Sequence, residues 1–184
     1  MTALDFFARW RVRLGYPLAL IVLCLARPTL RSILLGAALG VFGLLIRAFA
    51  AGYLHKQEVL TVTGPYAHTR NPLYFGSGLL TVGAAVAMNS WSAAALLLIY
   101  FTLVYSFVMR REEMELRRKH GEVFDTYAAA VPLFFPRLSA GKQAAAAGGS
   151  FSWQLYKRNH EQQAALGFGL LQIALVAIWR MRLP

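Results

Sequence analysis

The chain has 184 residues, of which 58% are hydrophobic and 15% are charged, and its formal net charge is +11. Soluble domains contain roughly 25% charged residues, so this composition argues against an ordinary soluble fold and predicts a membrane protein built as one bundle with a tail. The basic residues flank apolar runs, where they would contact anionic headgroups, and no basic soluble domain is present to bind nucleic acid.

Two apolar runs make up the first part of the chain. Residues 1–13 combine Trp10 with three arginines, a pattern typical of a membrane interface. The first run, Leu14–Ala26, has the basic flank and short core of a signal peptide, but no clear cleavage site follows it, so we expect a retained helix. The second run, Ser32–Leu54, would be about 34 Å long as a helix and can span a bilayer. Arg47 lies inside it and either faces the bundle interior or snorkels to the membrane surface.

A polar, turn-rich stretch, Thr63–Gly76, separates the two apolar halves of the chain and is called the polar segment below. Pro65 and Pro72 each remove an amide donor and push the preceding residue out of helical geometry, so they mark two breaks. Between the prolines lie an aromatic ring, an imidazole and a permanent cation, which belong to Tyr66, His68 and Arg70. The polar segment is either a solvated connection between helices or one side of a binding site, since amides near a helix start bind anions.

The next 39 residues, Asn71–Met109, contain no Lys, Arg, Asp or Glu. Two helices fit this length, at Leu73–Met88 and Trp91–Met109, with a turn at Asn89-Ser90. The turn has no basic residue whereas both outer ends of the hairpin do. The positive-inside rule therefore places the turn outside and the polar segment in the cytoplasm.

The second helix of this hairpin continues into water as a charged run. Basic residues one helical turn away predict ion pairs within the helix, of Glu113 with Arg110 or Arg117 and of Glu115 with Lys119. Glu112 has no such neighbour, and a carboxylate at the membrane boundary is destabilising unless a partner compensates its charge. Because the antiparallel hairpin brings the polar segment to the level of Glu112, we expect that partner to be Arg70, His68 or a cationic ligand.

The rest of the chain divides into three parts. We expect residues 1–138 to form the transmembrane core, and its last stretch, the aromatic and proline-rich 124–136, either caps a cavity or lies on the bilayer. Residues 139–150 are rich in Ala and Gly and predict a linker. Residues 151–184 begin with interfacial aromatics, followed by a fifth span at Gln162–Trp179 or by a short amphipathic or re-entrant helix.

Several common kinds of active site have no signature in this sequence. The four histidines are far apart and form no HExxH-type pair, so we expect no metal site. The single cysteine, Cys24, excludes an intramolecular disulfide and a multi-cysteine metal site. A GxSxG elbow and phosphate-binding glycine loops are absent, and the short Gly76-Ser77-Gly78 is more typical of close helix packing in a membrane.

Four ordered motifs remain. They are GPYAHTRNPLYFG, a charge-free hairpin of about 35 residues, RREEMEL, and GEVFDTYAAAVPLFFP, and together they extend from about Leu54 to Arg137. In this order and spacing the sequence resembles the isoprenylcysteine carboxyl methyltransferase and phospholipid methyltransferase superfamily. The preceding GLLIRAFAAGYL is also similar to the corresponding helix of bacterial members.

The resemblance implies an integral membrane methyltransferase that uses S-adenosyl-L-methionine, bound between the polar segment, the hairpin's cytoplasmic end and the aromatic tail. The positions that match the family's cofactor contacts are Leu60, Tyr66, Arg70, Asn71, Pro72, Leu73, Tyr74 and Glu112. Arg70 matches the arginine of the family's RHP motif and Glu112 its cofactor glutamate, so the resemblance implies catalytic roles for both. Asn71 stands where many members have histidine.

The methyl acceptor is less well defined. Carboxyl-methylating members carry an arginine one turn before the first glutamate, and Val108 occupies that position here, which argues against a prenylcysteine carboxylate. We expect a hydrophobic or lipid-linked acceptor that enters from the bilayer. Phospholipid amine N-methylation and a noncatalytic membrane scaffold or carrier are the alternatives.

The expected architecture is an all-α integral membrane bundle of about five transmembrane helices, surrounded by membrane lipids. The resemblance to bacterial members implies an inner membrane, with the cofactor site on its cytoplasmic side.

Overall fold

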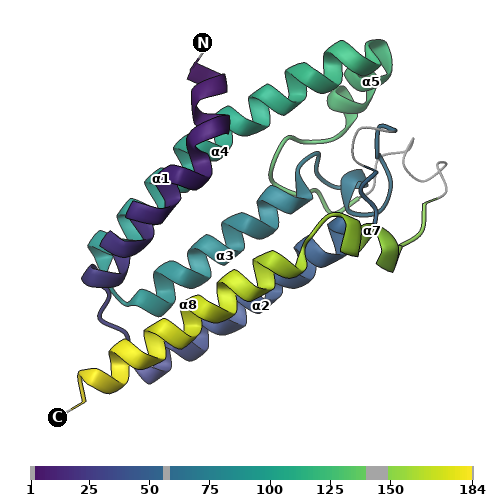
Figure 1. Cartoon of the computed structure of the whole chain (residues 1–184). Coiled ribbons are helices and arrows are strands. Elements are labelled where there is room, and N and C mark those ends of the chain that lie inside the picture. Colours follow the sequence, from purple (N-terminus) through teal and green to yellow (C-terminus); the bar gives the residue numbers. More distant parts are fainter. Residues whose placement is uncertain (1–2, 56–58, 140–148, 184) are drawn as a thin grey trace.

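The chain is described by a computed structural model over residues 3–55, 59–139 and 149–183. Within these residues the fold is all-α, as predicted, with seven α-helices, one 3-10 helix and no strand (Figure 1). In chain order the elements are α1 (Ala3–Leu25), α2 (Leu30–Ala51), η1 (Gly64–Ala67), α3 (Pro72–Met88), α4 (Trp91–His120), α5 (Glu122–Ala130), α7 (Trp153–Arg158) and α8 (Gln162–Met181). The predicted linker at 139–150 falls mainly on residues 140–148, outside the described part of the chain.

Three helices are long and apolar enough to cross a membrane, namely α2, α4 and α8. Two shorter apolar stretches, Arg13–Leu25 within α1 and Pro72–Met88, accompany them. Large hydrophobic side chains point outward from these helices, and Leu45 and Ile173, for example, are 62% and 68% exposed. Contact with lipid accounts for such exposure, because apolar surface of this extent is unusual in water. These features indicate an integral membrane protein.

The α2 and α3 helices pack against each other through glycines. A Cβ added to Gly83 of α3 would lie 2.7 Å from the Gly36 carbonyl oxygen, and one added to Gly76 would lie 2.8 Å from the Gly43 carbonyl oxygen. Only residues without a side chain allow two helix backbones to approach so closely, and membrane helices commonly associate in this way. The prediction that Gly76 serves helix packing is confirmed, and α3 is held firmly against α2.

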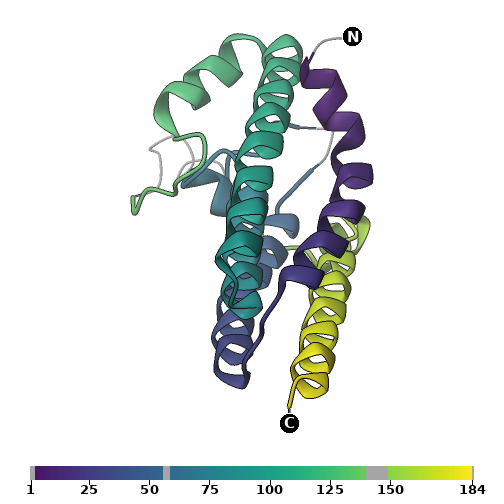
Figure 2. The same ribbon diagram turned by 90° about the vertical axis from the view of Figure 1, so that its left-hand side faces the viewer.

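The α3 and α4 helices form the predicted antiparallel hairpin. Asn89 ends α3 with a φ of 49°, a left-handed conformation that asparagine tolerates, and Ser90 caps α4. Helix α1 packs along α4 and α8 packs along α2 (Figures 1 and 2). Near the α3–α4 turn, Val22, Met88 and Leu175 bring α1, α3 and α8 together in a buried apolar core.

At the other end of the bundle the chain folds back on the polar segment. Gly121, with a φ of 53°, turns the chain from α4 into α5. After α5, the Pro132 carbonyl accepts from the Arg70 amide at 2.9 Å, and the Arg137 amide donates to the His68 carbonyl at 3.0 Å. The aromatic, proline-rich stretch therefore packs on the polar segment and fixes its path.

Candidate functional site

A cavity of about 830 Å³ lies where the polar segment, α4, α5 and the α7–α8 junction meet. Its lining includes all eight residues selected through the family resemblance, which are Leu60, Tyr66, Arg70, Asn71, Pro72, Leu73, Tyr74 and Glu112. The polar segment and the first turn of α3 supply most of them, and the water-facing part of α4 supplies the carboxylate. The structure thus brings the predicted residues around one cavity, and the ligand they bind stays a prediction.

Glu112 is held by a residue of α3. The Tyr74 hydroxyl donates a hydrogen bond to Glu112 Oε1 at 2.5 Å. The Tyr74 ring also packs edge-to-face on Tyr105, with ring centroids 5.2 Å apart. A phenol bound to a carboxylate makes a short, charge-assisted hydrogen bond, which fixes the Glu112 carboxylate at the cavity wall. The hairpin geometry expected from the sequence is confirmed by this contact.

Arg70 reaches α4 from the polar segment but contacts the neighbouring acid. Its Nη1 lies 2.6 Å from Glu113 Oε1, and the two side chains are 16% and 24% exposed. The expectation that Glu113 pairs within its own helix was therefore wrong, because the polar segment brings Arg70 to Glu113. A role of Arg70 in compensating the charge of Glu112 stays a prediction. Glu115 does pair within its helix, with Arg111 rather than Lys119. Among the described residues, the buried Arg70 Nε has no hydrogen-bond partner.

Asn71 and His68 hold the returning chain in place. Asn71 Nδ2 donates to the Leu133 carbonyl at 3.0 Å, and His68 Nδ1 lies 2.9 Å from the Arg137 carbonyl oxygen. Asn71 also lines the cavity, whereas His68 is not among its lining residues. His68 therefore serves the fold of the polar segment, and the suggestion that it compensates Glu112 was wrong.

Two buried tyrosines join the polar segment to α5. The Tyr127 hydroxyl donates to the Tyr66 carbonyl at 2.7 Å. Burial raises the pKa of the Tyr66 phenol well above its ordinary value, and nearby acidic groups raise it further. Burial likewise raises the pKa of Tyr127, where Arg70 opposes the shift and Glu113 adds to it. Both phenols are therefore neutral donors at physiological pH.

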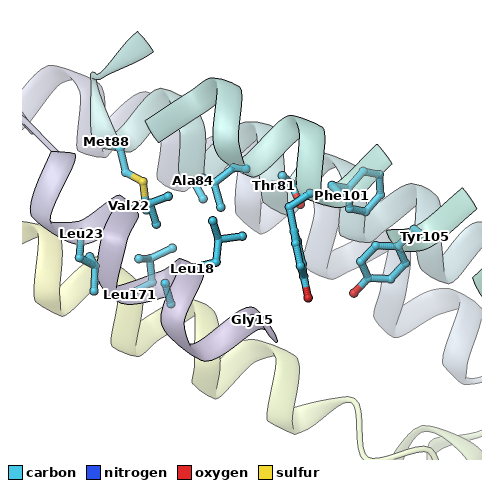
Figure 3. Close-up of a pocket in the computed structure, with 13 residues that line it drawn as sticks. Gly15, Leu18, Val22, Leu23, Thr81, Ala84, Met88, Phe101, Tyr105 and Leu171 are labelled. Atoms are coloured by element: carbon cyan, nitrogen blue, oxygen red, sulfur yellow. The ribbon is translucent and has the colours of Figure 1, made fainter. Parts of the chain in front are cut away.

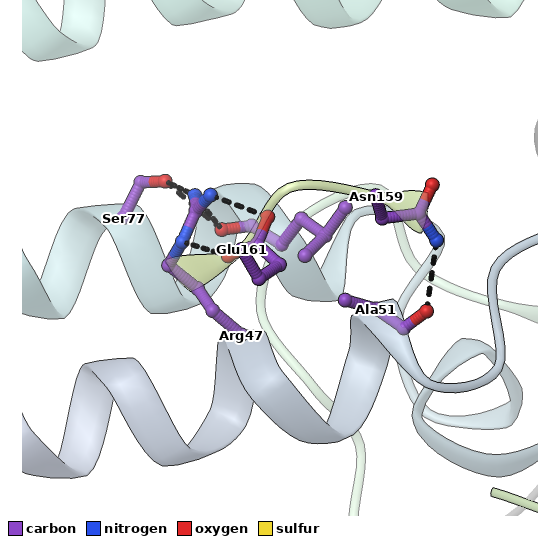
Figure 4. Close-up of polar contacts among 6 residues, drawn as sticks. Arg47, Ala51, Ser77, Asn159 and Glu161 are labelled. Carbon is purple, nitrogen blue, oxygen red and sulfur yellow. Dashed lines mark hydrogen bonds and ion pairs between the residues drawn. The ribbon is translucent and has the colours of Figure 1, made fainter. Parts of the chain in front are cut away.

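The cavity has a further wall that the sequence reasoning missed. The α7–α8 junction contributes Asn159, His160, Glu161, Gln163 and Ala164 to the lining. Arg47 of α2 donates to Glu161 twice, from Nε to Oε2 at 3.0 Å and from Nη2 to Oε1 at 2.7 Å (Figure 4). Of the two alternatives for Arg47, the inward-facing one is confirmed. One feature of the sequence could have pointed to Glu161: it is the sole acidic residue after Asp125 and directly precedes an apolar run.

A smaller crevice of about 240 Å³ lies between α1, α3, α4 and α8. Its lining is mostly apolar and includes Leu18, Val22 and Leu171 (Figure 3). Tyr105 lines both the crevice and the larger cavity. The crevice therefore extends from the level of Tyr105 along α3 toward Met88 near the α3–α4 turn.

The polar groups of the larger cavity limit the kind of ligand it suits. In the described part of the chain, no group of three or more His, Cys, Asp or Glu residues is placed to hold a metal ion. The cavity instead combines carboxylates with guanidinium groups and with the apolar Leu60 and Leu73. This combination suits a ligand that carries both charges beside an apolar or aromatic part.

The sequence is similar to two proteins that are named for metal resistance. Nickel-cobalt-cadmium resistance protein NccN of Alcaligenes xylosoxydans xylosoxydans is 39% identical over 108 residues, which are 58% of this chain and 49% of that protein. Cobalt-zinc-cadmium resistance protein CzcN of Cupriavidus metallidurans is 29% identical over 177 residues, which are 91% of this chain and 77% of that protein. The chain thus spans about half the length of NccN. No solved structure matches the chain.

A family model described as phospholipid methyltransferase matches residues 15–123. This range begins in α1, contains the α3–α4 hairpin with the polar segment, and ends just inside α5. It therefore includes every residue that the resemblance selected for the cavity. The chain belongs to the phospholipid methyltransferase family.

Proposed function

We propose that the chain is a membrane methyltransferase that uses S-adenosylmethionine and methylates a hydrophobic or lipid-linked acceptor. One observation carries the proposal: all eight positions that match the family's cofactor contacts line a single cavity of about 830 Å³. That volume lies in the range of small-molecule sites, roughly 300–1,000 Å³. A noncatalytic scaffold would leave Glu112 in water or paired within its own helix, and the bond from Tyr74 argues against that alternative.

The charges of the cavity fit the proposed cofactor. Glu112 provides a fixed negative charge, which favours a cationic sulfonium and an ammonium group. Arg70 has a buried Nε that lacks a hydrogen-bond partner among the described residues, and such a donor can bind the cofactor's carboxylate. Tyr66 adds a neutral phenol, while Leu60 and Leu73 provide apolar walls for a nucleoside. These residues together would hold both ends of the ligand.

The residues of the chain would act by alignment. S-adenosylmethionine supplies an electrophilic methyl group when bound. Transfer of that group needs donor and acceptor in line and water excluded, and no covalent enzyme intermediate is required. Tyr74 and Arg70, each tied to a neighbouring glutamate of α4, fix the polar segment against the hairpin and so supply a rigid frame for that alignment.

The apolar crevice supports an acceptor with a hydrocarbon part. It meets the cavity at Tyr105, so a chain lying in the crevice would place its polar head beside the Tyr74–Glu112 pair. Val108 supplies no cation there, which disfavours a carboxylate head. A phospholipid amine is the runner-up acceptor, because Glu112 would also attract an amine.

The proposed topology has five spans, with α1 and α3 added to the three long helices, and the cavity faces the cytoplasm of a bacterial inner membrane. The basic residues of α4 lie at the cavity end, whereas the α3–α4 turn carries none. A Ser90→Cys substitution in a Cys24→Ala chain should react with an impermeant maleimide from outside. Labelling from the cytoplasmic side alone would show that the proposed orientation is wrong.

Two relatives are named as resistance proteins for metals that include cobalt and cadmium, so a role in metal resistance is a second candidate. If methylation serves such a role, expression of the chain should raise the cobalt concentration that cells tolerate, and Glu112→Gln should abolish the gain. Tolerance that survives this substitution would separate metal resistance from methyl transfer.

Calorimetry on the detergent-purified protein tests the proposed cofactor. We expect heat on addition of S-adenosylmethionine and of S-adenosylhomocysteine, with weaker binding of both by Arg70→Ala. No heat with either nucleoside would refute the methyltransferase proposal. Unchanged binding by Arg70→Ala would instead refute the assignment of its carboxylate contact. A screen of radiolabelled methyl transfer to membrane lipids would then identify the acceptor class.

A further inference from the structure

The buried ion pair between Arg47 and Glu161 lies at the cavity yet joins distant parts of the chain. The two side chains are 18% and 8% exposed, and the residues are 114 positions apart. The family match ends at residue 123, so it contains Arg47 but not Glu161. A buried pair of this kind is weak evidence for added stability, since desolvation offsets much of the attraction. A role in arranging the cavity is therefore worth testing.

The guanidinium of Arg47 also contacts the first turn of α3. Its Nη1 donates to the Leu73 carbonyl at 3.2 Å and to the Ser77 hydroxyl, and that hydroxyl donates to the same carbonyl at 3.0 Å. Figure 4 shows the Arg47 side chain between Ser77 and Glu161. One cation thus binds α2, α3 and the start of α8 together. Because Glu161 occupies two of its donors, it orients the third toward α3.

The contacts continue across the cavity. The same first turn of α3 carries Leu73 and Tyr74 into the lining, and Tyr74 donates to Glu112 of α4. A chain of polar contacts therefore runs from α8 through Arg47 and α3 to α4. Movement of Glu161 would be transmitted to the residue that fixes the Glu112 carboxylate.

The α7–α8 junction is itself anchored, so Glu161 is held in place. Asn159 is buried, and its Nδ2 donates to the Ala51 carbonyl at 2.9 Å and to the Leu54 carbonyl at 3.0 Å. Ala51 is the last residue of α2 and Leu54 follows it, so Asn159 ties the α7–α8 junction to the end of α2. His160 follows with a φ of 56°, a sharp turn that leads directly into Glu161.

We propose that Glu161 is a positioning residue of the cavity: through Arg47 it fixes the first turn of α3 and, with it, Tyr74 and Glu112. The α7–α8 segment is then a functional wall of the site rather than an appended anchor. The consequence for ligand affinity rests on the proposed function, whereas the effect on α3 does not.

The test uses the full-length double variant Arg47→Met with Glu161→Met. Apolar residues of similar size often replace a buried ion pair without loss of stability, so this chain should fold. Hydrogen exchange of the ligand-free protein should become faster at the amides of residues 75–78, which belong to the first turns of α3. Affinity for S-adenosylhomocysteine should fall about tenfold, the scale on which coupled contacts act.

Two further variants make the result specific. Arg47→Lys retains the charge opposite Glu161 but lacks the separate nitrogens with which the guanidinium binds Glu161 and α3 at the same time, so it should show the same faster exchange. Leu175→Ala, which is fully buried at the far end of α8, should lower the melting temperature without changing exchange at 75–78 or ligand affinity.

The outcomes are separable. Unchanged exchange at residues 75–78 in both Arg47 variants would overturn the proposal, whatever the ligand does. Faster exchange with unchanged affinity would overturn its functional part. If the exchange becomes faster while the wild-type protein binds no S-adenosylhomocysteine, the positioning role stands and the proposed methyltransferase function fails.

Discussion

Two concave surfaces of the described chain meet at Tyr105 and are built by different means. The larger cavity is held by charged and hydrogen-bonded pairs between elements far apart in sequence, such as Arg70 with Glu113 and Arg47 with Glu161. The crevice is formed by mostly apolar side chains of α1, α3, α4 and α8. Under the proposed function, the directional contacts of the cavity would orient the charged cofactor, and the apolar crevice would accept the hydrocarbon part of the acceptor.

The largest effect is expected from a substitution in the larger, polar cavity. Glu112→Gln removes the negative charge that Tyr74 orients, so affinity for S-adenosylmethionine should fall by about 1.5–3 kcal/mol, the range of hydrogen bonds to charged groups. Titration calorimetry measures the change. Glu122→Gln is the matched control, because Glu122 is exposed on α5 and does not line the cavity. Equal losses in both variants would indicate a general effect of charge rather than a contact at Glu112.

The next effect concerns α3, a helix that contributes to both surfaces. Gly83→Ala would place a Cβ 2.7 Å from the Gly36 carbonyl oxygen, so it should destabilise the protein by about 2 kcal/mol through overpacking. Thermal unfolding in detergent measures this loss. In the control Gly167→Ala on α8, the new methyl group would meet nothing within 4 Å, and the higher helix propensity of alanine should keep stability unchanged or raise it. Equal stability of both variants would contradict the close α2–α3 packing.

A smaller effect is expected on the apolar side. Leu18→Trp should partly fill the crevice and lower kcat/KM for the lipid acceptor by about tenfold, or roughly 1.4 kcal/mol. Its affinity for S-adenosylhomocysteine should match that of the wild type. Leu20→Trp on the same helix is the control, because Leu20 is 68% exposed and does not line the crevice. Weaker binding of S-adenosylhomocysteine by Leu18→Trp would contradict the proposal that the cavity and the crevice bind different ligands.

Local patterns in the sequence were enough to predict the helices. Apolar runs bounded by charges located α2, α4 and α8, and Asn89-Ser90 located the turn of the hairpin. The hairpin then placed Tyr74 and Glu112 at one level, because two antiparallel helices of known length must bring their outer ends together. The eight family-matched positions came from the resemblance rather than from such patterns, and the structure places them around one cavity.

The pairing of charges could not be predicted from such patterns. Basic residues one helical turn from Glu113 suggested a partner within its own helix. The residues that follow α5 instead hold the polar segment in a path that brings Arg70 to Glu113. The contact of Arg47 with Glu161 depends on how α8 packs on α2, which no local rule describes. Arg47 inside one apolar run and Glu161 at the start of another were the available clue, because a charge in such a place needs a partner.

The smallest expected effect appears only at high pH and sharpens the description of the polar cavity. Burial raises the pKa of Tyr66 and Tyr127, so folding favours their neutral forms. Their contribution to stability is complete below the ordinary phenol pKa of about 10 and is lost as the pH rises above it. Ultraviolet titration of tyrosinate should therefore show at least two phenols that ionise later than ordinary ones, with one fewer in Tyr66→Phe. If Tyr66 ionised near the ordinary phenol pKa, water would reach it freely. The cavity would then fail to exclude water at this residue, as methyl transfer requires.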